Sequence, residues 1–125
     1  MTSCARFVLH AVTTYVRERF APTACETDSL GGFGADIDKE GRVVLTDHGA
    51  FVLVNVYIPN AGAASGEPAA KPRLEFKLKF LKALHAKLEA LREAGREVGG
   101  VAHGARARAR AFSYGRCSMS FQFGV

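Results

Sequence analysis

The fold is decided by residues 42–62, which read RVVLTDHGAFVLVNVYIPNAG. Two runs rich in β-branched and apolar residues, 42–46 and 51–58, are joined by a short connection that contains Asp and Gly. Two such runs with such a connection are typical of an antiparallel β-hairpin. The second run is apolar at nearly every position, which predicts a strand that is covered on both faces.

The second run ends in two polar residues, Tyr57 and Asn60. Polar groups at the end of a central strand are a common way for an α/β protein to build an active site. A tyrosine there can donate a hydrogen bond to a phosphate oxygen, and a nearby asparagine can bind the same group. The local pattern alone favours a structural interpretation, in which Tyr57 packs at the edge of the core and Asn60 caps the turn.

The other elements are predicted from periodicity and turn chemistry. Residues 6–16 predict a first strand, 36–41 a tight turn, and the Gly- and Pro-bearing segments 20–35 and 61–72 loops. An amphipathic helix is predicted for residues 73–95, ending at Gly95. Its apolar stripe comprises Leu74, Leu78, Leu81, Leu84 or His85, Leu88 and Leu91. Strand, loop and helix in this order, with a strand buried on both faces, indicate a layered α/β architecture.

Length, charge and cysteine content set broad limits. A chain of 125 residues suits one small domain, and its net charge of +5 is compatible with a polyanionic partner. Three widely spaced cysteines, Cys4, Cys25 and Cys117, argue against a disulfide framework or a zinc site and favour a reducing compartment. Because no run of about 18 apolar residues occurs, we expect no membrane span.

The composition changes after Val98. The remainder contains the alternating tract ARARAR at 105–110 and shows no sustained helical stripe. A basic tract of this kind would bind any polyanion weakly and without specificity. We therefore expect a partial α/β domain over residues 1–98 and a divergent, disordered basic tail over residues 99–125.

Other titratable residues give weaker signals. Asp36, Asp38, Glu40 and Asp47 gather around the hairpin and could in principle bind Mg²⁺, although turn-forming and surface roles fit them better. The four histidines, His10, His48, His85 and His103, have no metal-binding spacing. His85 lies on or beside the apolar stripe of the helix, which predicts a packed or boundary residue rather than a ligand.

Two stretches together carry a resemblance to a known family. EGRVVLTDHGAFVLVNVYIPNAG (40–62) and RLEFKLKFLKAL (73–84) resemble the exonuclease III-type AP endonucleases of the endonuclease/exonuclease/phosphatase superfamily. The segments TDHGAFVLVN and FKLKF are most similar to the plant and algal branch of DNA-(apurinic or apyrimidinic site) endonuclease 2. The resemblance covers about residues 8–98 and implies a fragment of a layered α/β sandwich, with a mixed, largely antiparallel sheet and a flanking helix.

The resemblance implies roles for three residues. Tyr57 would lie in the catalytic site near the scissile phosphate, Asn60 would hold that phosphate, and Arg73 would lie at the DNA-facing helix start. Lys71 and Lys77 extend the basic face of Arg73 and could contact phosphates. The parent enzyme would use Mg²⁺ to cleave DNA at abasic sites and 3′ ends during base-excision repair, in the nucleus or in an organelle, with no membrane partner.

The resemblance also fails at defined places. The strands that carry the family's metal-binding Asn and Glu would precede Met1. The family's Gly-Asp-x-Asn strand should follow GREV (95–98), but the residues after GREV contain no such motif. We therefore expect an internal piece of a larger fold that is itself inactive. The Ala/Arg/Gly composition after residue 98 suggests a frame change or an unspliced intron, a hypothesis that sequencing the spliced transcript across codons 95–104 would test.

Two alternatives to the nuclease fragment remain. The chain could be a noncatalytic nucleic-acid-binding fragment whose basic helix face and ARARAR tract supply the affinity. It could also come from another member of the superfamily that acts on RNA or on a phosphoinositide, which the EGR turn and Tyr-Ile-Pro-Asn-Ala-Gly disfavour.

Overall fold

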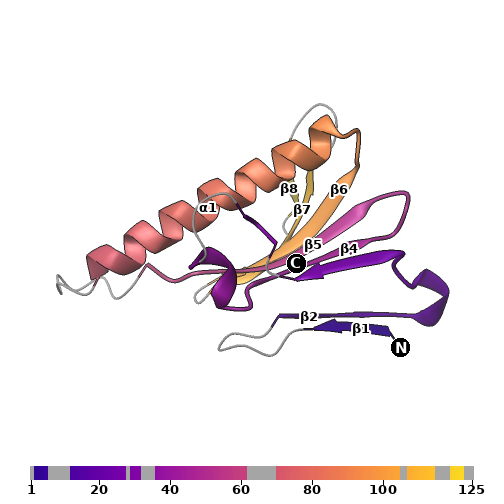
Figure 1. Ribbon diagram of the computed structural model, residues 1–125, viewed down its shortest axis with the longest axis horizontal. Coiled ribbons are helices and arrows are strands. Elements are labelled where there is room, and N and C mark those ends of the chain that lie inside the picture. Colours follow the sequence, from indigo (N-terminus) through magenta and orange to yellow (C-terminus); the bar gives the residue numbers. More distant parts are fainter. Residues whose placement is uncertain are drawn as a thin grey trace.

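The computed structural model describes residues 2–5, 12–27, 29–31, 36–61, 70–104, 107–114 and 119–122. Within these ranges, six strands form one sheet in the spatial order β3 (Ala24–Thr27), β4 (Val43–Asp47), β5 (Val52–Ile58), β6 (Val98–Gly104), β7 (Ala107–Tyr114) and β8 (Met119–Gln122). The β5–β6 pair is parallel, and the other neighbouring pairs are antiparallel. Helix α1 (Ala70–Glu93) connects β5 to β6 and lies across one face of the sheet (Figure 1). The predicted α/β class, with a mixed, largely antiparallel sheet and a flanking helix, is confirmed.

The core lies between α1 and the sheet. Along β5 the residues alternate, so that Val52, Val54 and Val56 are buried against the helix. The helix contributes Phe80, Ala83, Leu84 and Leu88 to the same cluster. Alternation of this kind follows from the two-residue repeat of a strand, and burial of these side chains supplies most of the driving force for docking the helix.

The opposite face of the sheet is covered by a second, two-stranded sheet, formed by β1 (Thr2–Ala5) and β2 (Thr13–Val16). The Val12 N–H donates to the Gly41 carbonyl at 3.2 Å, and Asn55 Nδ2 donates to the Thr13 carbonyl at 3.2 Å. β5 is therefore covered on both faces, completely by α1 and in part by β2, where its side chains are half-buried. The buried Asn55 Oδ1 has no hydrogen-bond partner among the described residues.

The end of α1 follows the sequence prediction. Gly95 has φ of 76°, a backbone conformation that glycine adopts without steric cost. Its N–H donates to the Arg92 carbonyl at 2.8 Å, and the Arg96 N–H donates to the Leu91 carbonyl at 3.0 Å. This pair of bonds is the Schellman motif, which satisfies helix carbonyls that would otherwise lack donors.

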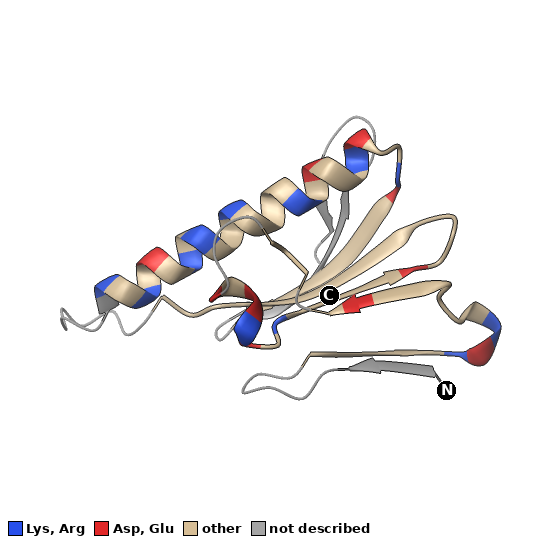
Figure 2. Ribbon diagram, viewed as in Figure 1, with Lys and Arg blue, Asp and Glu red and all other residues tan. Residues whose placement is uncertain are grey.

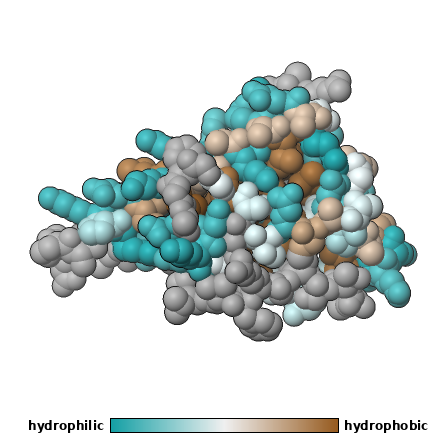
Figure 3. All heavy atoms as spheres, in the orientation of Figure 1, coloured by the Kyte–Doolittle hydropathy of each residue, from teal (hydrophilic) through white to brown (hydrophobic). Residues whose placement is uncertain are grey.

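The apolar stripe of the helix differs from the prediction in its first half. Leu74 and Leu78 are exposed, and so is His85, which was expected to be packed or at a boundary. The first turns of α1 extend past the edge of the sheet, so that no strand lies beneath them in Figure 1. Figure 3 shows a largely hydrophilic surface on the described residues of this side, with apolar residues visible where the helix meets the sheet.

Several other elements were not predicted. β3 and the short 3-10 helix η1 (Glu18–Phe20) lie in or beside the segment expected as a loop, and a second 3-10 helix, η2 (Ile37–Lys39), occupies the predicted turn. Residues 99–125 were expected as a disordered tail, whereas most of β6 and all of β7 and β8 lie there. The parallel pairing with β5 supplies β6 with hydrogen bonds that its Gly-rich sequence does not signal.

Cysteine pairing also differs from the expectation. Cys25 in β3 is disulfide-bonded, although the odd cysteine count argued against a disulfide framework. A spacing argument of this kind cannot detect a single cross-link, because pairing depends on which strands meet in space.

Candidate functional site

The carboxyl ends of the parallel strands β5 and β6 meet at one edge of the sheet. Register pairs Tyr57 with His103 and Ile58 with Gly104, so the two strands end side by side. Tyr57 and His103 are both half-buried, whereas Asn60 is exposed, two residues beyond the end of β5. In open α/β sheets, ligands bind at the carboxyl ends of parallel strands, which makes this edge the candidate site.

Tyr57 is fixed at this edge by Arg42. The Tyr57 N–H donates to the Arg42 carbonyl at 2.8 Å, and Arg42 Nη1 donates to the Tyr57 carbonyl at 3.2 Å. The Arg42 guanidinium also lies 5.2 Å from the centroid of the Tyr57 ring. Its side chain is 2% exposed, so its charge requires a partner inside the protein.

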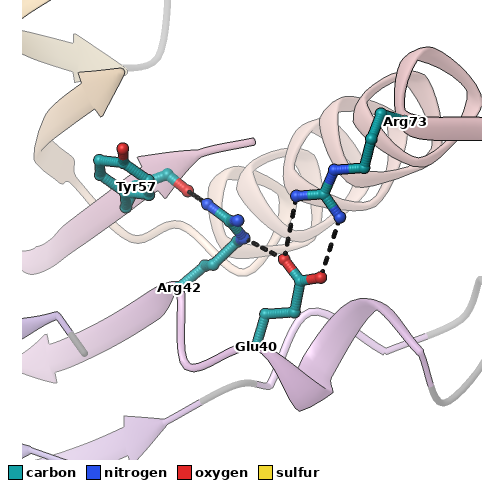
Figure 4. A network of polar contacts seen from close by, with 4 residues as sticks. All are labelled: Glu40, Arg42, Tyr57 and Arg73. Carbon is teal, nitrogen blue, oxygen red and sulfur yellow. Dashed lines mark hydrogen bonds and ion pairs between the residues drawn. The ribbon is translucent and has the colours of Figure 1, made fainter. Parts of the chain in front are cut away.

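Glu40 provides that partner and links β4 to the helix. Arg42 Nε donates to Glu40 Oε2 at 2.6 Å, and Arg73 Nη1 donates to Glu40 Oε1 at 3.0 Å. We call these four residues, Glu40, Arg42, Tyr57 and Arg73, the Glu40 network (Figure 4). One carboxylate between two guanidiniums is favourable because both of its oxygens accept charged hydrogen bonds.

The Glu40 carboxyl titrates below its usual range. Desolvation by burial is the largest single influence and raises its pKa, but the hydrogen bonds and charges of Arg73 and Arg42 together outweigh it and lower the pKa. The carboxylate is therefore ionised at neutral pH, and the network carries a net positive charge.

The predicted basic residues have different surroundings. Arg73, at the start of α1, is held by Glu40 and lies 4.9 Å from the centroid of the Phe76 ring. Lys71 is exposed, and Lys77 is half-buried one turn beyond Arg73. The structure thus connects Tyr57 to Arg73 through the Glu40 network, and no hydrogen bond or ion pair among the described residues joins Asn60, Lys71 or Lys77 to it.

The acidic residues near the hairpin do not converge on a metal site. Asp38 accepts hydrogen bonds from the Leu30 and Gly31 N–H groups, both at 3.0 Å, and Asp36 pairs with Lys39. Asp47 lies at the other end of β4, where Arg96 binds it. In the described part of the chain, no group of three or more His, Cys, Asp or Glu side chains is placed to hold a metal ion. Asp36, Asp38, Glu40 and Asp47 therefore do not form the Mg²⁺ site that they could in principle have provided.

Two residues of the site were missed by sequence reasoning. Arg42 appeared as part of a turn motif, and its burial beneath Tyr57 depends on a contact 15 residues away. His103 lies beside Tyr57 because β5 and β6 are parallel neighbours, which no local pattern signals. Of the remaining histidines, His48 lies at the β4–β5 turn, His85 is on the surface of α1, and His10 lies outside the described residues.

Comparison with known proteins adds no relative. No protein-family model matches the chain, and no curated protein matches it significantly. No helix in the described ranges has both the length and the apolar character that crossing a membrane requires.

Proposed function

We propose that this chain carries the phosphate-holding part of a Mg²⁺-dependent, exonuclease III-type DNA phosphodiesterase, whose parent enzyme acts at abasic sites and 3′ ends. The observation that supports this most is the position of Tyr57, at the carboxyl end of β5, held through its backbone by Arg42. Asn60 follows at the same edge, and the motif containing both is the one that resembles the family. By itself, the chain is proposed to be inactive.

The chemistry of these side chains suits phosphate rather than metal. The phenol of Tyr57 and the amide of Asn60 are neutral donors, and phosphate oxygens accept such bonds without an added counter-charge. The nearby Glu40 network contributes a net positive charge to the same end of the molecule. Bound Mg²⁺ would supply an activated water in the parent enzyme, but the described residues offer no ligand set for it.

Two matched tyrosine variants test the proposal. A labelled DNA duplex with one abasic-site analogue is incubated with the purified chain, with and without Mg²⁺, and both nicking and binding are measured. We expect no nicking, and we expect Tyr57→Phe or Asn60→Ala to weaken binding by about three- to tenfold, the usual effect of one lost hydrogen bond. Tyr15→Phe removes only the hydroxyl of an exposed tyrosine of β2 and keeps its ring, so it should leave binding unchanged.

Each departure from this pattern has one meaning. Mg²⁺-dependent nicking that Tyr57→Phe impairs would overturn the inactivity of the chain and establish it as an enzyme. Binding that is unchanged in both Tyr57→Phe and Asn60→Ala would overturn the phosphate-holding role of this edge.

The second candidate is a noncatalytic nucleic-acid-binding fragment. Helix α1 carries seven Lys or Arg residues against three Glu, and Figure 2 shows the basic residues spread along its length. If this charge alone supplies the affinity, binding should fall steeply between about 50 and 200 mM salt and be indifferent to Mg²⁺. Tyr57→Phe would then behave as the unchanged chain does at every salt concentration.

A further inference from the structure

A cavity of about 540 Å³ lies at the end of the molecule opposite to Tyr57. It is bounded by β2, η1, the β4–β5 turn and the start of β5, on the sheet face that α1 does not cover. Figure 1 shows η1 and the β4–β5 turn at the same end, away from the first turn of α1. Its size falls within the usual range for small-molecule sites, roughly 300 to 1,000 Å³.

Aromatic rings line this cavity and remain open to solvent. Tyr15, Phe20 and Phe51 are 69%, 57% and 42% exposed. They are three of the five large hydrophobic residues that are exposed in the described ranges, the others being Leu74 and Leu78 on α1. Exposed apolar side chains that gather in one concave place indicate a binding site, whereas scattered ones do not.

One wall of the cavity is held in place by polar contacts. His48 Nδ1 donates to the Phe20 carbonyl at 3.0 Å, and its Nε2 lies 2.9 Å from Thr46 Oγ1. The His48 ring also stacks on Phe51, with centroids 4.9 Å apart and planes 16° from parallel. Because η1 and the β4–β5 turn are tied together through His48, the aromatic wall is formed before any ligand arrives.

The charge at the cavity is positive. Arg19 lies in its lining, with its guanidinium 4.8 Å from the centroid of the Phe20 ring, and the described lining includes no Asp or Glu. Both ring nitrogens of His48 have partners, which leaves Arg19 as the group that would meet a charged ligand. A guanidinium beside aromatic rings suits a ligand that has a flat ring and an anionic group.

We propose that this cavity binds a small planar aromatic anion, whose ring lies against Tyr15, Phe20 and Phe51 and whose anionic group pairs with Arg19. A nucleoside monophosphate and a simple aryl carboxylate share this chemistry. The proposal does not depend on the function of the Tyr57 edge, because it shares no residue with the Glu40 network.

The test uses two pairs of probes that differ in charge. Binding of 2-naphthoate and of neutral 2-naphthalenemethanol, and of dAMP and of neutral deoxyadenosine, is measured by NMR titration of the isotope-labelled chain. We expect each anion to bind about two- to fivefold more tightly than its neutral partner, because one additional ion pair forms with Arg19, whose side chain is exposed. Arg19→Gln should remove that difference while leaving the binding of the neutral probes unchanged.

The rings are tested separately from the charge. The double variant Tyr15→Ser/Phe20→Ser should weaken all four probes, and Leu74→Ser/Leu78→Ser, which removes exposed apolar residues from the helix instead, should weaken none. All of these side chains are exposed, so the fold should survive and far-UV circular dichroism verifies it. Tighter binding of dAMP than of naphthoate assigns the site to nucleotides, and the reverse assigns it to aryl carboxylates.

Three results would overturn the proposal. The first is equal affinity for the anionic and neutral members of both pairs. The second is a Tyr15→Ser/Phe20→Ser variant that binds as the unchanged chain does. The third is the absence of saturable binding of all four probes up to roughly 10 mM, the weak limit of a specific small-molecule site.

Discussion

The two ends of the β4–β5 hairpin each carry an arginine–carboxylate pair, and the two pairs differ in burial. At the Tyr57 end, the side chains of Arg42 and Glu40 are 2% and 22% exposed. At the turn end, those of Arg96 and Asp47 are 31% and 29% exposed. Both are close pairs of the same chemical type, so the difference between the ends lies in what surrounds the charges.

Burial decides what each pair contributes. Water can reach both partners of the half-buried turn-end pair, so this pair contributes less to stability. A guanidinium that is 2% exposed has no access to bulk water, and the loss of its partner leaves an uncompensated charge inside the protein. We infer that the Tyr57 end is held rigidly by the Glu40 network and that the turn end depends mainly on local hydrogen bonds.

The largest expected effect is that of removing the buried arginine. Arg42→Met keeps the apolar stem but removes the donors to Glu40 and to the Tyr57 carbonyl. We expect it to lower the free energy of unfolding by about 3 kcal/mol, because the Tyr57 carbonyl and a carboxylate oxygen of Glu40 lose the donors that Arg42 supplies. Urea unfolding followed by circular dichroism measures this change.

Arg42→Lys serves as the control for charge. Lysine retains the positive charge but cannot form the two directed bonds of the guanidinium, so a smaller loss is expected. A loss in Arg42→Met no greater than that of an exposed substitution such as Lys39→Met would contradict the inference that burial makes this end rigid.

The parts of the fold that could be predicted from the sequence have local signals. The β4–β5 hairpin follows from two β-rich runs and an Asp/Gly connection, and the end of α1 follows from Gly95. β6 has no such signal, because its Gly-rich sequence becomes a strand through pairing with β5 and burial of Val98 under the helix. Leu74 and Leu78 were misassigned because periodicity does not reveal where the supporting sheet ends.

The polar residues of the candidate site could be predicted, but the contacts that hold them in place could not. Tyr57 and Asn60 could be identified as polar groups at a strand end. The contact between Glu40 and Arg73 spans 33 residues, and nothing in the local sequence indicates that Arg42 is buried. The aromatic cavity was missed for the same reason, because Tyr15 and Phe51 come together only through the packing of β2 on the sheet.

A smaller effect, dependent on pH, is expected from Glu40→Gln. Because the folded state lowers the pKa of Glu40, this carboxylate stabilises the fold above its unfolded-state pKa, and that stability is lost as pH falls through the folded-state value. At pH 7 we expect Glu40→Gln to cost about 2 kcal/mol. The difference between the two proteins should shrink as pH falls below the unfolded-state pKa of a glutamate, about 4.3, and through the lowered pKa of folded Glu40, because the unchanged chain then takes up a proton there.

Unfolding free energies measured from pH 7 to pH 3 test this expectation. Glu26 and Asp47 also have lowered pKa values, so the stability of both proteins should fall with acid. The informative quantity is therefore the difference between the two proteins. A difference in unfolding free energy that stays constant from pH 7 to pH 3 would contradict the expectation. It would show that the negative charge of Glu40 does not contribute to stability.

The smallest effect is expected at the turn end, from Asp47→Asn. The pKa of Asp47 is lowered chiefly by its hydrogen bond with Arg96 and then by that from the Gly49 N–H, so the carboxylate does interact with its partners. Asparagine retains an oxygen that accepts from Gly49, and both charged side chains reach solvent. Asp47→Asn should therefore lower the melting temperature less than Glu40→Gln does.

The clearest test of the difference between the two ends is how the effect of each substitution on stability depends on salt concentration. At about 1 M salt the screening length falls to roughly 3 Å, which weakens exposed pairs much more than buried ones. The difference between Asp47→Asn and the unchanged chain should then shrink by a larger fraction than the Glu40→Gln difference, because solvent ions cannot approach the Arg42 guanidinium. Equal salt sensitivity at the two ends would mean that burial does not distinguish them, and the assignment of the rigid end to the Glu40 network would be wrong.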